Sequence, residues 1–113
     1  ISRMEIKSKK VVRPTFYLTD IQDTFEYGEA TFGENVALYF YEYIKLTIRR
    51  LETEYLLHPE CRHLVTKIKM YRNIILGSYL IIYRIRAEKI EVLRAFHGSR
   101  SPKIIKESKK IKI

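Results

Sequence analysis

The sequence has few of the residues on which disulfide scaffolds and membrane spans depend. Cys61 is its single cysteine, so no internal disulfide can form and a secreted disulfide scaffold is excluded. The longest apolar run, residues 74–83, is much shorter than the roughly 18 residues that cross a bilayer. No signal-peptide pattern is found, and we therefore expect a cytoplasmic protein that makes no membrane contact.

Several enzyme motifs are also missing. The four glycines are isolated from one another, which excludes a glycine-rich phosphate loop, and there is no Gly-x-Ser-x-Gly elbow. His58, Cys61 and His63 lie close together, but a loop this tight cannot easily give tetrahedral zinc geometry. The neighbouring Arg62 further disfavours a cation, so we expect neither a metal nor another cofactor.

The size and composition fit one small folded domain. The chain has 113 residues, of which 46% are hydrophobic and 31% charged, which is typical of a soluble domain with one core. We therefore predict a single domain over residues 1–113, with no room for a separate cofactor domain. Residues 1–3 precede Met4 and are expected to be a cloning remnant, and residues 101–113 are expected to form a basic tail.

Charge is distributed unevenly along the chain. The net charge is +9, but residues 15–60 carry −6 while residues 1–14, 61–93 and 94–113 carry +4, +5 and +6. A basic surface of this kind attracts anionic partners, either nucleic acid or an acidic protein. The plain alternative is a soluble surface without a partner.

Apolar spacing predicts a strand followed by two helices. Residues 5–13 read as a strand that ends at Pro14. Residues 15–31 read as a helix that ends at Phe32-Gly33, and a second helix extends to Pro59 after a loop of about four residues. Apolar stripes at helical spacing are most often core, so we predict an antiparallel helical hairpin that packs on a sheet. The two stripes consist of Leu18, Ile21, Phe25, Gly28 and Phe32, and of Ala37, Tyr41, Ile44, Ile48, Leu51 and Tyr55.

Three further strands are predicted at residues 67–76, 79–86 and 89–97, joined by turns at Gly77-Ser78 and Ala87-Glu88. If the second turn pairs Arg86 with Lys89, then Arg84 faces Glu91, Ile82 faces Leu93 and Leu80 faces Ala95. The face with Ile81, Tyr83, Val92, Arg94 and Phe96 is nearly all apolar and should meet the helices. The resulting class is α+β: an N-terminal strand, a helical hairpin and a three-stranded antiparallel meander in one sheet.

The opposite face of the predicted sheet is mixed and is the better candidate for function. Cationic residues gather on or beside it: Lys67, Lys69, Arg72, Arg84, Arg86, Arg94, His97 and Arg100. Such a set could clamp phosphates, with His97 transferring a proton. It could equally be a solvated basic face in which His97 is structural, and the residues alone leave both interpretations open.

One ordered string of residues resembles the RelE/ParE toxin superfamily. Residues 79–84 match the Tyr-x-Ile-x-Tyr-Arg strand of its ParE-type branch, and residues 97–100 match the His-Gly-x-Arg that ends the next strand. Asp20-Ile21, Phe32-Gly33 and His58-Pro59 are similar to the same branch. The resemblance covers about residues 5–102.

This resemblance implies the toxin of a type II toxin–antitoxin module, held inactive in a hetero-oligomer with a cognate antitoxin whose tail is acidic. ParE-type toxins inhibit DNA gyrase, and RelE-type toxins cut mRNA on the ribosome. In the RelE-like alternative the catalytic residues would be His97, Arg84, Arg94 and Arg100. We assign binding of nucleic acid or of another target to Lys67, Lys69, Arg72, Arg86, Lys103 and Lys106. A third alternative is an inactive member that only binds an antitoxin or DNA.

Overall fold

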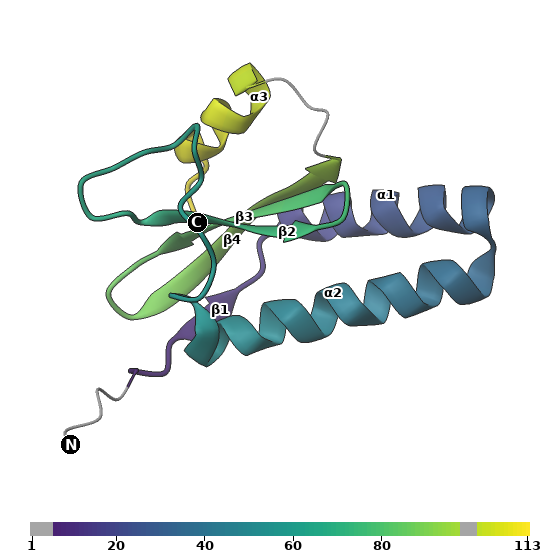
Figure 1. Cartoon of the computed structure of the whole chain (residues 1–113), viewed down its shortest axis with the longest axis horizontal. Coiled ribbons are helices and arrows are strands. Elements are labelled where there is room, and N and C mark those ends of the chain that lie inside the picture. The colour runs from purple at the N-terminus through teal and green to yellow at the C-terminus, as the bar shows by residue number, and fades with distance from the viewer. Residues whose placement is uncertain (1–5, 98–101) are drawn as a thin grey trace.

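The protein is a four-stranded sheet with a helical hairpin on one face and a short C-terminal helix on the other (Figure 1). The computed structural model describes residues 6–97 and 102–113. Its elements are β1 (Lys10–Val12), α1 (Thr15–Phe32), α2 (Glu34–Glu54), β2 (Tyr71–Leu76), β3 (Tyr79–Ile85), β4 (Lys89–His97), α3 (Pro102–Glu107) and the 3₁₀ helix η1 (Ser108–Lys110). The predicted class and element order are confirmed.

The strand order in the sheet is β1-β4-β3-β2. β1 pairs in parallel with β4, and β2, β3 and β4 form the predicted antiparallel meander. β1 and β2 are both shorter than predicted. For β2 the reason is that residues 55–70 form an irregular connection in which only Glu60 makes a bridge, to Arg72. Within the described ranges no helix is long and apolar enough to cross a membrane.

A single glycine reverses the chain between α1 and α2. Gly33 has a φ of 93° and a ψ of 163°, a conformation that residues with side chains rarely adopt. Its N–H donates to the Glu29 carbonyl at 3.1 Å, and its own carbonyl accepts from the Ala37 N–H at 3.1 Å. The loop of about four residues predicted from the sequence is therefore wrong, because this backbone bend needs one residue only.

The two helices approach closely near this turn. A β-carbon added at Gly28 would lie 3.4 Å from the Ala37 β-carbon, an ordinary van der Waals contact. We expect Gly28→Ala to raise the free energy of unfolding by about 0.5–1 kcal/mol, since alanine is favoured over glycine inside helices. Gly28→Leu should lower it, because a longer side chain forces the helices apart. Urea unfolding of both variants measures this, and equal stabilities would contradict the close contact.

The main core lies between the hairpin and the sheet. Ile44, Ile48 and Leu51 of α2 are fully buried, as the predicted stripe requires. In α1 the stripe is only partly right, since Tyr17 and Ile21 are buried while Leu18 and Phe32 are 53% and 64% exposed. For Phe32 the reason is that the hairpin extends past the end of the sheet, which leaves the distal part of α1 without a strand beneath it (Figure 1). Leu18, near the start of α1, instead borders a hollow between α1 and α2.

The predicted strand register holds at one end of the β3–β4 pair and fails at the other. Arg84 faces Glu91 as predicted, but the register shifts between Ile82 and Tyr83. Beyond the shift, Ile81 faces Ala95 and Leu80 faces Phe96. One extra residue in β4 reverses which side chains meet the helices, so Ala95 joins the hairpin core and Phe96 the opposite face, contrary to prediction.

The basic C-terminal segment packs against the sheet. Ile105 and Ser108 are buried and Ile111 is half-buried, a spacing of three that matches the tight turns of η1. Ile105 belongs to the same cluster as Ile82, Leu93 and Phe96. The lysines between these positions are exposed. The segment thus covers the face that the sequence marked for function.

Candidate functional site

The centre of the mixed sheet face is a buried carboxylate surrounded by three cations. Glu91 Oε1 accepts from Arg84 Nε at 2.6 Å and Arg86 Nε at 2.9 Å, and Glu91 Oε2 lies 3.3 Å from Lys89 Nζ. The Glu91 and Arg84 side chains are only 2% and 3% exposed. We call these four residues the Glu91 cluster.

Both buried members of the Glu91 cluster stay charged. Burial alone would raise the pKa of Glu91, but the hydrogen bond and charge of Arg84, with Arg86 and Lys89, hold it below its usual range. Burial alone would lower the pKa of Arg84, but Tyr71 and Glu91 hold it above its usual range. The Glu91 cluster is therefore ionised at neutral pH.

The remaining donors of Arg84 hold the C-terminal segment. Arg84 NH2 donates to the Ile111 carbonyl at 2.8 Å, and NH1 donates to the Lys109 carbonyl at 3.3 Å and the Tyr71 hydroxyl at 3.4 Å. In this arrangement the guanidinium binds the protein's own backbone and has no open side for an RNA phosphate.

Arg94 is engaged in a different contact, at the edge of the sheet. Its Nε and NH2 donate to the two carboxylate oxygens of Asp20 at 2.6 and 3.0 Å, and the Ala95 N–H donates to the same carboxylate at 2.9 Å. The hydrogen bond that Arg94 donates to Asp20 raises the pKa of Arg94. Because β1 pairs only with residues 89–91 of β4, Asp20 satisfies an edge N–H that has no strand beside it. Asp20 thereby fixes α1 on β4.

The predicted target-binding residues divide into structural and exposed groups. Arg72 donates to the carbonyls of Lys69, Leu56 and His58 at 3.0, 3.3 and 2.9 Å, so it holds the irregular connection in place. Lys67 and Lys69 are exposed on that connection, and Lys103 and Lys106 are exposed on α3. Of the six predicted target-binding residues, these four lysines and Arg86 are exposed, whereas Arg72 is half-buried.

The predicted catalytic residues do not converge. His97 lies at the far end of β4, its ring 5.9 Å from that of Tyr79, which it faces across the strands. It lies six positions after Glu91, which is about 20 Å along a strand. Arg94 faces α1, as described above, and Arg100 falls outside the described residues.

The cysteine and histidines of the connection form no metal centre in the described part of the chain. Cys61 is buried, and burial raises the pKa of its thiol. The His58 ring lies 6.1 Å from the Tyr83 ring, and burial lowers the pKa of the His58 imidazole. Both side chains therefore pack as neutral groups against the sheet.

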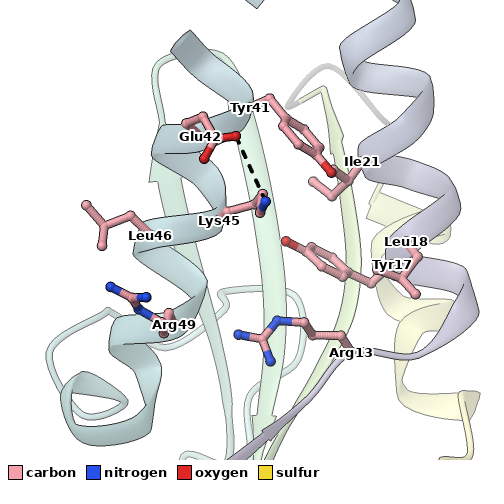
Figure 2. Close-up of a pocket in the computed structure, with 9 residues that line it drawn as sticks. All are labelled: Arg13, Tyr17, Leu18, Ile21, Tyr41, Glu42, Lys45, Leu46 and Arg49. Atoms are coloured by element: carbon pink, nitrogen blue, oxygen red, sulfur yellow. Dashed lines mark ion pairs between the residues drawn. The ribbon is translucent and has the colours of Figure 1, made fainter. Parts of the chain in front are cut away.

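Two hollows on the helical hairpin were not anticipated from the sequence. One is a pocket of about 540 Å³ between the first turns of α1 and the second half of α2, into which Tyr17 and Tyr41 project (Figure 2). The other is an apolar groove of about 400 Å³ near the hairpin turn, lined by residues that include Phe25, Phe32, Val36, Phe40 and Tyr79. No sequence signal marks either hollow, because both depend on how far apart the two helices lie.

Comparison with known proteins agrees with the fold and the strand motifs. Residues 13–102 match the family model of the ParE toxin of the type II toxin–antitoxin system parDE. A chain of the chromosomal ParDE system from P. aeruginosa has a TM-score of 0.65, covers 80% of this chain and 97% of its own length, and is 13% identical. That likeness shows a shared fold.

A search of curated proteins finds no match. Most of α3 and all of η1 lie beyond the matched residues. The family model itself covers well over half of the sequence, including the hairpin and all three strands of the meander. The chain therefore belongs to the ParE toxin family of type II toxin–antitoxin systems.

Proposed function

We propose that this chain inhibits DNA gyrase by binding it, without catalysing a reaction, and that a cognate antitoxin neutralises it. The observation that supports the proposal most directly is that two arginines are already engaged in ion pairs inside the protein. Arg84 and Arg94, which an RNA-cutting site would need free, are the partners of Glu91 and Asp20 in this family member. The geometry thus favours binding over mRNA cleavage.

The exposed surface of the protein suits a partner that has both apolar and acidic groups. Large apolar side chains are exposed on the hairpin, among them Phe32 at 64% and Tyr39 at 78%. Exposed apolar groups gathered in this way are typical of a surface that another protein covers. The positive charge lies outside the hairpin, in residues 1–14 and 61–113, where it suits acidic segments of the same partner. We propose that the antitoxin covers this surface in a hetero-oligomer in the cytoplasm, where gyrase is found.

Pulse labelling of growing bacteria tests the target. After induction of the chain alone, we expect thymidine incorporation to fall within minutes, before methionine incorporation changes. His97→Ala should leave this effect intact, because the proposal gives His97 no proton to transfer. Purified protein should then inhibit gyrase supercoiling of plasmid DNA.

An early fall in methionine incorporation that His97→Ala or Arg84→Ala abolishes in folded protein would instead establish the nuclease alternative. Normal growth on induction, together with full gyrase activity in the purified assay, would contradict both activities. It would leave a protein that only binds an antitoxin or DNA.

A further inference from the structure

The C-terminal segment carries a row of lysines on its outer side. Residues 102–113 contain five lysines and one acid, Glu107. Ile105 and Ile111 pack in the cluster on the sheet, whereas all five lysines are exposed. Four of the lysines line an open hollow of about 430 Å³ together with Glu107, and we call these four the lysine surface: Lys103, Lys106, Lys109 and Lys110.

The charge of the lysine surface is not neutralised within the described part of the chain. The lysines that form ion pairs there are Lys7, Lys45 and Lys89, none of which belongs to this surface. Side chains three residues apart on a helix lie about 5–6 Å from one another, so these cations repel one another until an anion binds. The lysine surface therefore attracts a partner that carries many closely spaced negative charges.

The backbone that carries the lysine surface is fixed to the sheet. Arg84 NH2 donates to the Ile111 carbonyl at 2.8 Å, and Arg84 NH1 donates to the Lys109 carbonyl at 3.3 Å. Arg84 is itself held by Glu91, and Ile105 is only 4% exposed. The lysines are therefore already in place, and a partner does not have to order the segment on binding.

The residues of this segment distinguish among the polyanions that it could bind. Ile105 and Ile111 pack on the sheet, so they are not available for insertion into a lipid bilayer. Residues 102–113 contain no aromatic side chain on which the bases of a single strand could stack. Lysine is depleted in the centre of protein–protein interfaces, whereas interfaces with DNA are strongly positive. Duplex DNA, with one charge per about 1.7 Å of its axis, is the partner that fits best.

We propose that the lysine surface binds the phosphate backbone of duplex DNA without reading its sequence. All five basic residues of the segment are lysines, which contact phosphates as point charges. Arginine, whose planar group pairs with two acceptors at once, is missing from residues 102–113. The inference does not rest on the proposed function, because neither gyrase nor an antitoxin takes part in the contact.

A binding titration with DNA alone tests the surface. The probe is a fluorescein-labelled duplex of about 20 base pairs, followed by fluorescence anisotropy, and we expect a Kd of about 1–100 μM at physiological salt. The double variant Lys103→Gln and Lys106→Gln should bind about tenfold more weakly or worse, with an unchanged melting temperature. It should also lower the slope of log K against log salt by about 2, since two phosphate contacts are lost.

The matched control removes the same charge from the other face of the sheet. Arg49 and Arg50 are exposed on α2, and replacing both by glutamine should change the affinity less than about threefold, because salt screens charges beyond about 8 Å. Equal losses in the two double variants would show general charge attraction and overturn the proposal. So would an absence of binding, equal affinity for a single strand, or displacement of the duplex by polyglutamate at the same concentration of charge.

Discussion

Replacing Glu91 by glutamine is expected to destabilise the protein more than any other change of a single charge in the described residues. Glutamine keeps the volume of the side chain but removes the charge that faces Arg84, Arg86 and Lys89. Arg84 would remain buried without an ionised partner, and breaking such a pair typically costs about 3–5 kcal/mol. For a domain of this size that corresponds to a fall in melting temperature on the order of 10–20 °C.

Glu88→Gln is the matched control. Glu88 lies three residues earlier and also touches a lysine, with 2.6 Å between its Oε1 and Lys7 Nζ, but its side chain is 76% exposed. Surface ion pairs of this kind contribute little, so no measurable shift in melting temperature is expected. Similar stabilities for the two variants would show that the Glu91 cluster does not hold the sheet face together.

The cost of Glu91→Gln should also depend on pH. The pKa of Glu91 is lower in the folded protein than in the unfolded chain, so its ionised form stabilises the fold above the ordinary glutamate pKa of about 4.3. This contribution is lost as the pH falls through the lower, folded-state pKa. Urea unfolding should therefore give a full difference between wild type and variant at pH 7 and a shrinking difference below about pH 4.

Placing an aspartate at position 105 is expected to detach the C-terminal segment. Ile105 is 4% exposed and packs with Ile82, Leu93 and Phe96. Loss of this contact and burial of a carboxylate together cost at least about 3 kcal/mol, which exceeds what a six-residue helix can recover from its other contacts. We expect trypsin to cleave at Lys103 and Lys106 much faster in Ile105→Asp than in wild type, with the hairpin and sheet still folded.

Ile113→Asp introduces the same charge at a site that is 42% exposed, and it should leave the cleavage rate unchanged. Equal cleavage of wild type and Ile105→Asp would contradict the packing of α3 on the sheet.

The packing of α3 on the sheet also decides which variants can test the function of the C-terminal segment. Deleting residues 103–113 would uncover Phe96 and Arg84, whereas glutamine at the exposed Lys103 and Lys106 removes charge without loss of packing.

Local physical rules determined the elements of this fold. Helical spacing of Ile44, Ile48 and Leu51 placed one face of α2 in the core, and Gly77-Ser78 joined two strands in the expected hairpin. The opposition of Arg84 and Glu91 followed from counting back from the Ala87-Glu88 turn. These features depend on neighbours within a few residues, so the sequence alone was sufficient.

The roles of the charged side chains were decided only by the tertiary structure. The sequence alone does not distinguish a basic residue that is exposed to solvent from one that binds a phosphate or a buried carboxylate. Arg94 reaches Asp20 across 74 residues, and Arg84 reaches the Ile111 carbonyl across 27. Contacts at that separation leave no local pattern, so the sequence admits both arginines to the catalytic set of the RelE-like alternative.

The sequence by itself determined the class, the order of the elements and the resemblance to a toxin family, because periodicity and turn residues are local properties. The tertiary structure alone decided the shift at Ile82, the cover over the mixed sheet face and the opening between α1 and α2. Each of these is set by how distant surfaces fit together. A shift of one residue or a few ångströms between helices changes which groups are buried without changing any sequence pattern.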